Sequence, residues 1–152
     1  MCSFVRFPFA LNAAGCLLCL AAGGSIGHVT EGQATSHDAA KGAALYSANC
    51  TACHQANGEG LPGTFPPLKG SGVVNKDDAT KHIRVVLDGM QGEKAGGVVY
   101  GSAMPPFAAV LSDADIADIV DYERGSWGNH GKPVTAAQVA AERAKSKKAE
   151  QR

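Results

Sequence analysis

Two cysteines and a histidine stand within five consecutive residues, Cys50-Thr51-Ala52-Cys53-His54. On a helical turn, side chains three residues apart project from one face, so both sulfurs can reach one edge of a flat ligand. The next residue is then carried beneath that ligand, where an imidazole nitrogen can bind a metal. This spacing is typical of covalent haem attachment. It predicts that Cys50 and Cys53 bond one haem c through thioethers and that His54 binds its iron.

Paired cysteines are also found in disulfides, redox-active dithiols and zinc sites. A structural zinc site needs four ligands, and the sequence has no second Cys-x-x-Cys pair and no His-x₃₋₅-His pair to complete one. A thioredoxin-like dithiol sits in a βαβ pattern, which is absent here. The other three cysteines, Cys2, Cys16 and Cys19, lie near the N-terminus. Haem attachment is therefore the favoured interpretation of Cys50 and Cys53.

A methionine is the expected second ligand of the iron. Met104 lies 50 residues after His54, in the segment Gly101-Ser102-Ala103-Met104-Pro105-Pro106-Phe107. The glycine and prolines favour an extended strap that crosses the far face of the ligand without helical hydrogen bonds. A neutral thioether favours Fe(II) and fills the site against O₂. The competing role for Met104 is gap-filling in the core, which is common for methionine.

Weaker candidates for that ligand are Met90, His82, His130, His28 and His37. Met90 stands at a predicted helix end and is expected to be a packing residue. His82 lies beside apolar Ile83, and we expect it to be a surface histidine or one with its hydrogen bonds satisfied.

The elements that must hold these residues are helices separated by long loops. Capping residues mark four helix starts: Asp38, Asp77 or Asp78, Ser112 with Asp115, and Thr135 with Gln138. Apolar residues recur at helical spacing after the second and third of these starts. Residues 55–72 and 89–101 are rich in glycine and show no helical period, so they are expected to be loops. The sequence predicts an all-α bundle of four to five helices around one covalently bound haem.

The chain divides into four predicted segments. Residues 1–27 have the charged start and apolar run of an export signal, with Arg6 before an uncharged stretch, and an uncleaved membrane anchor is the alternative. Residues 28–37 form a polar linker, residues 38–130 the haem domain, and residues 131–152 a helical extension with a basic end. Export predicts a periplasmic protein that meets the membrane only if the signal is retained.

Composition limits the function classes. The 152 residues carry no net charge at pH 7, and no basic groove or zinc-finger spacing indicates nucleic-acid binding. Aromatic residues make up only 6%, so a large apolar cofactor would add substantially to a small core. Residues 142–152 contain five basic and two acidic residues, a net charge of +3. A solvated helix end is favoured over a docking tail for these charges.

The motifs together resemble class I cytochrome c. They are Gly42 and Tyr46 before the cysteine motif, Phe65-Pro66-Pro67-Leu68, Met104-Pro105, and a helix ending near Tyr122. The resemblance covers roughly residues 39–128 and is closest to the cytochrome domains of bacterial dehydrogenase subunits and of respiratory oxidase or nitrite reductase partners. The phrases Tyr122-Glu123-Arg124 and Ser126-Trp127-Gly128-Asn129 are similar to that subgroup. The extension from Lys132 to Arg152 lies outside the resemblance.

The resemblance implies roles for individual residues. Gly42 and Tyr46 should contact Ile119 and Tyr122 where the first and last core helices cross. A carbonyl from Pro66 or Pro67 should accept the free ring N–H of His54, and Pro67 is included among the cofactor-contacting residues. Tyr100 is placed to reach a haem propionate, with simple packing of the strap as the alternative.

The expected activity is transfer of single electrons, with no bond made in a substrate. The expected partners are redox proteins such as a dehydrogenase, a reductase or a terminal oxidase, met either by diffusion or as a docked subunit. The alternative from another class is a haem enzyme or gas sensor such as a peroxidase. That chemistry needs an open sixth position on the iron, and Met104 argues against it.

Overall fold

The computed structural model describes residues 38–92 and 94–150, which lie within one compact unit. Its helices are α1 (Ala39–Asn49), α2 (Thr51–His54), α3 (Thr80–Asp88), α4 (Asp113–Gly125) and α5 (Ala136–Glu150). The predicted signal and linker, residues 1–37, lie outside the described residues, as do the side chains of the basic chain end beyond Ser146. The all-α fold class is confirmed. Among the described helices, none has the length and apolar character needed to cross a bilayer.

The helix starts follow local chemistry. Asp38 accepts hydrogen bonds from the backbone N–H groups of Ala40 and Lys41, and Ser112 forms a capping box with Asp115. Helix α3 begins at Thr80, slightly later than predicted, and the carboxylate of Asp78 accepts the Thr80 N–H at 3.0 Å. Helix α3 ends at Gly89, as predicted from the sequence, and this glycine has the positive φ of 74° that glycine adopts readily at helix ends.

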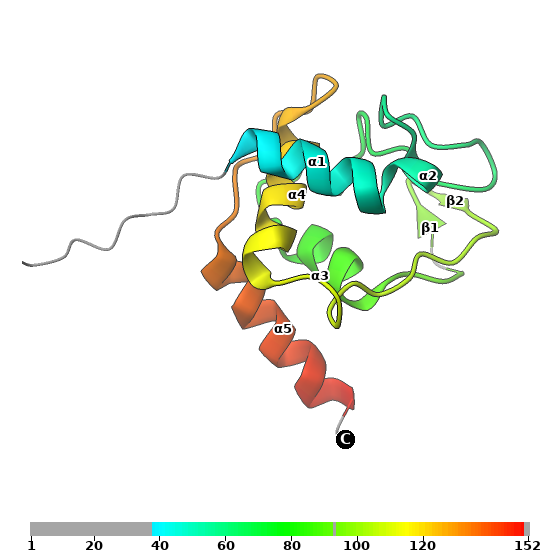
Figure 1. Ribbon diagram of the computed structural model, residues 1–152. Helices are drawn as coiled ribbons and strands as arrows, with labels where there is room; N and C mark the ends of the chain where they lie inside the picture. Colours follow the sequence, from blue (N-terminus) through cyan, green and yellow to red (C-terminus); the bar gives the residue numbers. More distant parts are fainter. Residues whose placement is uncertain (1–37, 93, 151–152) are drawn as a thin grey trace, which may run out of the picture. The chain divides into compact units, whose positions relative to one another are not determined.

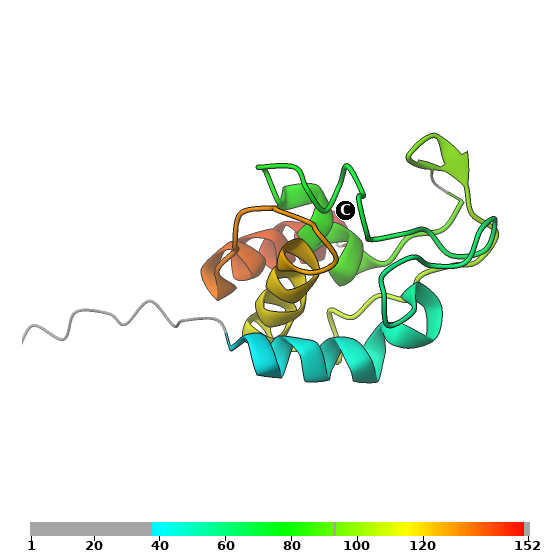
Figure 2. The same ribbon diagram turned by 90° about the horizontal axis from the view of Figure 1, so that it is seen from above.

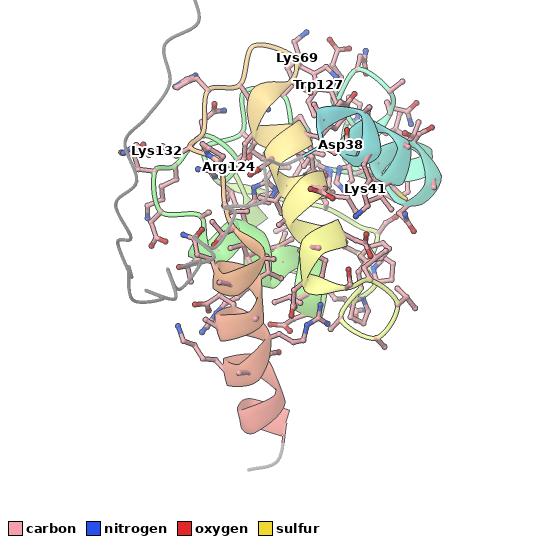
Figure 3. The ribbon with its side chains drawn as sticks, turned by 60° about the vertical axis from the view of Figure 1, so that its left-hand side comes forward. Asp38, Lys41, Lys69, Arg124, Trp127 and Lys132 are labelled. Atoms are coloured by element: carbon pink, nitrogen blue, oxygen red, sulfur yellow. The ribbon has the colours of Figure 1, made fainter. Side chains whose placement is uncertain are left out.

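Helices α1 and α4 cross at close range (Figures 1 and 2). Gly42 makes the approach possible, because a Cβ at this position would lie 2.4 Å from the backbone oxygen of Asp118. Next to it, the rings of Tyr46 and Tyr122 pack with centroids 5.2 Å apart, and Tyr46 clusters with Ile119. Lys41 reaches across to the carboxylates of Asp115 and Asp118 at 2.8 and 2.9 Å (Figure 3). The predicted crossing of these two helices is confirmed.

The crossing makes Gly42 intolerant of a side chain. We expect Gly42→Ala to lower the free energy of unfolding by about 1–3 kcal/mol, because the methyl group overpacks against the α4 backbone. Denaturant unfolding followed by circular dichroism measures the change. Gly125→Ala is the matched control, since a Cβ there meets nothing within 4 Å and alanine favours helix. Equal stability changes in the two variants would contradict the close-approach argument.

A second core lies where α3, α4 and α5 meet. Ile83, Leu87 and Ile116 are buried there together with Val134 and Val139 from the extension. Met104 and Phe107 pack against this cluster from the strap. Helix α5 lies against both α3 and α4, so the described part of the extension contributes to the same core as the cytochrome-like helices.

Arg124 fastens the end of α4. Its side chain is fully buried and donates to three backbone carbonyls, those of Lys132 at 2.6 Å, Lys76 at 2.7 Å and Val74 at 2.8 Å. Figure 3 shows Arg124 at the end of α4, on the side where Lys132 lies. One guanidinium thus holds the loop before α3 and the segment before α5 to the same helix.

A short hairpin departs from the purely helical expectation. Strands β1 (Lys94–Ala95) and β2 (Val98–Val99) pair antiparallel, with Lys94 opposite Val99. Gly96 and Gly97 both have positive φ, which suits the two-residue turns that connect such strands. The hairpin lies with α2 at one side of the helical group (Figures 1 and 2).

Candidate functional site

A cavity bounded by α2, α3 and the strap (residues 101–107) gathers the predicted site. It contains about 1140 Å³ of space between atoms, counting the part that is open to solvent. All six predicted site residues line it: Cys50, Cys53, His54, Pro67, Tyr100 and Met104. Apolar side chains such as Phe65, Leu68 and Val86 make up much of the remaining wall. The structure therefore brings the six residues together, and their individual roles toward a haem stay predictions.

The cysteine motif forms one helical turn on the cavity wall. Cys50 precedes α2, and the His54 N–H donates to the Cys50 carbonyl at 2.9 Å. These two cysteines form no disulfide, and Cys50 is buried and Cys53 half-buried. Burial, with smaller contributions from Glu123 and Cys53, raises the pKa of the Cys50 thiol to about 12. Redox-active dithiols need a lowered pKa, so this environment argues against that use of the pair.

His54 is buried and oriented by a backbone carbonyl. Its Nδ1 lies 2.9 Å from the oxygen of Pro66. A carbonyl only accepts, so Nδ1 carries the proton, and Nε2 keeps its lone pair for a metal. Gly60 permits this loop geometry, because a Cβ there would lie 2.5 Å from the Phe65 oxygen and 2.6 Å from the Pro66 oxygen. Of the two prolines considered, Pro66 is therefore the one whose carbonyl orients the His54 imidazole. Pro67, which belongs to the predicted site, lines the cavity wall.

The strap is bound to the end of α3 through its backbone. Met104 and Met90 exchange two hydrogen bonds, of 3.0 and 2.8 Å, and both side chains line the cavity. The Phe107 N–H donates to the Val86 carbonyl at 3.1 Å, which satisfies a carbonyl near the helix end. Gly89 lets the two segments touch, since a Cβ there would be 2.4 Å from the Met104 oxygen. Met104 is thereby held on a fixed stretch of backbone.

His82 and Glu123 form a pair in the cavity wall that the sequence analysis did not predict. His82 is 3% exposed, which excludes the first of its two expected roles, a surface histidine, and of its two ring nitrogens only Nε2 has a hydrogen-bond partner, so the second role is met in part. Its Nε2 lies 2.7 Å from Oε2 of Glu123, which is also 3% exposed, and both residues line the cavity. A signal was available: Glu123 continues the helical spacing of Ile116, Ile119 and Val120 and so falls on the buried face of α4.

The donor set fits a covalently bound haem. Two thiols stand on one helical turn beside a cavity with an apolar wall, and an imidazole with a free Nε2 follows them. A soft thioether is available from the strap. A helical fold that carries such a Cys-x-x-Cys-His turn in the wall of an apolar cavity is characteristic of c-type cytochromes. Residues 39–127 match the family described as Cytochrome c, and the chain therefore belongs to the cytochrome c family.

Relatives of known name agree with this assignment. Cytochrome c-552 of Thermus thermophilus is 39% identical over 115 residues, which cover 70% of this chain and 86% of that protein. The cytochrome c subunit of alcohol dehydrogenase (quinone) from Gluconobacter oxydans is 38% identical over 96 residues, or 63% of this chain and 20% of the subunit. The gluconate 2-dehydrogenase cytochrome c subunit of Pantoea cypripedii is 37% identical over 106 residues, or 68% of this chain and 24% of the subunit.

These matches confirm the predicted resemblance to class I cytochrome c and to dehydrogenase cytochrome subunits. Membership of the family implies a covalently attached haem c and a function in electron transfer. The predicted attachment residues Cys50 and Cys53 and the predicted iron ligand His54 fall inside the matched range.

Proposed function

We propose that this chain is an exported cytochrome with a single haem that passes single electrons between redox proteins in the periplasm. In this proposal residues 1–27 are an export signal, residues 28–37 a linker, residues 38–130 the haem domain, and residues 131–152 an extension. The observation that carries it is the helical turn of Cys50–His54 in the wall of a cavity that Met104 also lines.

Each residue has a stated task in this proposal. Haem iron, when bound, supplies the one-electron chemistry by cycling between Fe(III) and Fe(II). Cys50 and Cys53 hold the ring covalently, and His54 offers Nε2 to the iron while Pro66 fixes its tautomer. Met104 would offer its thioether to the iron, a ligand that favours the reduced state and fills the site against O₂. Tyr100 lines the same cavity, which supports its assignment to a haem propionate.

The proposed partners are redox proteins: a dehydrogenase, a reductase or a terminal oxidase. The names of the dehydrogenase cytochrome subunits support a partner of the first kind. This chain spans only about a fifth to a quarter of those subunits, and it covers most of cytochrome c-552. A freely exchanging carrier forms small, weak complexes, whereas a docked subunit stays with its enzyme through purification. Gel filtration of soluble extract and of solubilised membranes distinguishes the two.

A redox titration of the purified holoprotein, followed by its visible spectrum, tests the proposal. We expect one reversible one-electron transition and no rapid binding of CO to the reduced protein. Met104→Ala should keep the haem attached, open the iron to CO and lower the potential by a sizeable part of the roughly 0.8 V range that axial ligands control.

Met90→Ala is the matched control, because Met90 lines the same cavity and is hydrogen-bonded to Met104. It should leave both the potential and the closed sixth position nearly unchanged. If Met90→Ala opened the iron and Met104→Ala did not, Met90 would be the ligand. Rapid CO binding to the unaltered protein would instead favour a haem enzyme or gas sensor.

A further inference from the structure

A buried histidine–glutamate pair lies in the wall of the haem cavity, between α3 and α4. His82 and Glu123 are 41 positions apart in the sequence, and their Nε2 and Oε2 atoms are 2.7 Å apart. Each side chain is 4% exposed. Taking two ionisable groups out of water carries a desolvation penalty that their pairing can fail to repay in full, so this pair is costly to place in a small core.

One atom of the pair has no hydrogen-bond partner. Nδ1 of His82 is fully buried and unpaired, although a buried polar atom without a partner costs about 1–3 kcal/mol. An ionised carboxylate only accepts hydrogen bonds, so a neutral His82 must carry its proton on Nε2, facing Glu123. Nδ1 is then left with a lone pair, and it is the atom to which a further proton adds.

The carboxylate of Glu123 lies close to the haem-attachment residue Cys50. Its charge contributes to the raised pKa of the Cys50 thiol and to the raised pKa of the Tyr46 phenol, after the larger effect of burial in each case. The Cys50 sulfur marks the edge of the cavity at which a haem is attached in the proposed function. The His82–Glu123 pair therefore lies beside that edge, in a region shielded from solvent.

We propose that the His82–Glu123 pair is a proton-binding site coupled to the oxidation state of the haem. This inference rests on the proposed function and extends it from electron transfer to proton-coupled electron transfer. An electron arrives from the redox partner and reduces Fe(III) to Fe(II), while a proton from solvent adds to Nδ1 of His82. No bond forms or breaks in a substrate.

The coupling follows from charge. With neutral His82 the pair carries one negative charge, which favours the additional positive charge of the ferric state. Reduction removes that positive charge, and a proton on Nδ1 then relieves the uncompensated carboxylate. Charges inside a protein interact more strongly than charges in water, and salt screens them less. Proton affinity at His82 is therefore expected to be higher in the reduced protein.

Other titratable groups lie in the cavity wall or on the helices that pack against α3 and α4. Taken by element, they are Tyr46 and Cys50 on and just after α1, His54 on α2, Lys81 and Arg84 on α3, Lys94 and Tyr100 on the cavity wall, Tyr122 and Arg124 on α4, and Glu142 on α5. Arg124 donates to three backbone carbonyls, and Glu142 binds Arg84 and Lys145. Lys81 is exposed. Of the two histidines that line the cavity, His54 is assigned to the iron, and His82 is therefore the one left to bind the proton.

The test is the reduction potential of the holoprotein measured from pH 5 to pH 8. We expect the potential to fall as pH rises, because the reduced state holds the proton more tightly. A tenfold difference in proton affinity between the two states corresponds to a total fall of about 59 mV. Reduction in unbuffered solution with a pH indicator should also show uptake of protons per electron within that range.

Variants assign the effect to the pair. The double variant His82→Leu with Glu123→Leu removes both groups, a change that proteins often tolerate, and should give a potential independent of pH. Glu123→Gln keeps the histidine without its counter-charge and should move the pH-dependent region to lower pH. The matched control is His130→Gln, since His130 is exposed and does not line the cavity; it should keep the full pH dependence.

Two results would overturn the inference: a flat potential in the unaltered protein, or a pH dependence that survives in both the double variant and Glu123→Gln. Neither would affect the proposed function, which is judged by a reversible one-electron transition at a single pH. Absence of that transition would remove the proposed function and the proton coupling together.

Discussion

Replacing both Cys50 and Cys53 with alanine is expected to give an exported chain without covalent haem and without a stable fold. Cys50 and Cys53 line a cavity whose wall includes apolar side chains such as Phe65, Leu68 and Val86. Without an attached occupant, the apolar wall of that cavity stays in contact with water. A ligand that binds only the folded state stabilises that state, so its loss shifts the equilibrium toward unfolding. Small domains have little other burial to compensate.

Mass spectrometry and acid extraction measure the first part of this prediction, and far-UV circular dichroism measures the second. The double variant should have the mass of the bare polypeptide, no colour after acid extraction and little helical signal. Ala52→Ser is the matched control, because residue 52 lies between the cysteines, is exposed and takes no part in attachment. A double variant that kept its colour through acid extraction would show that the haem is held by other residues.

Sequence reasoning succeeded where structure depends on neighbours along the chain. The caps at Asp38 and Ser112, and the end of α3 at Gly89, each depend on one or a few adjacent residues. The cysteine motif is equally local, since one helical turn fixes the relation of Cys50 to Cys53. These features were predicted because their geometry needs no knowledge of the rest of the fold.

The features that were missed depend on contacts between distant segments. The choice between Pro66 and Pro67 is set by the turn at Gly60, which brings one carbonyl and not the other to His54. The His82–Glu123 pair joins two helices whose relative rotation is not encoded in either one alone. Periodicity shows that Glu123 is on the buried face of α4, but it does not show which residue meets it.

The contacts of Arg143 on α5 were equally invisible in the sequence, where this residue belongs to a basic run. Its Nε donates to the Asp113 carboxylate at 2.6 Å and its Nη2 to the Leu111 carbonyl at 2.9 Å. Its Nη1 donates to the carbonyl of Ala108, which follows the strap directly. One planar guanidinium thus binds residues 108–111 and the start of α4 together, a geometry that lysine cannot reproduce.

Arg143→Ala is therefore expected to lower the free energy of unfolding by about 3 kcal/mol, because two backbone carbonyls and a carboxylate lose a charged partner. The effect should extend to the haem site. The strap carries Met104, and its connection to α4 runs through the residues that Arg143 holds. If about 1.4 kcal/mol of this loss falls on the contacts that hold the strap over the iron, the population in which the strap has moved away rises about tenfold. CO association with the reduced protein should accelerate by a similar factor.

Denaturant unfolding and stopped-flow mixing with CO measure these two effects separately. Arg84→Gln is the matched control: it removes the 2.7 Å ion pair from Arg84 on α3 to Glu142 on α5, and Arg84 is 49% exposed. Glu142 is buried but keeps its second ion pair, with Lys145, after this substitution, so the loss of the half-exposed Arg84 should cost only about 1 kcal/mol. Arg143→Lys keeps the charge but loses the planar fork, so its stability should lie between those of the alanine variant and the unaltered protein. If Arg143→Ala and Arg84→Gln cost the same and neither changed CO association, α5 would stabilise the fold without holding the strap.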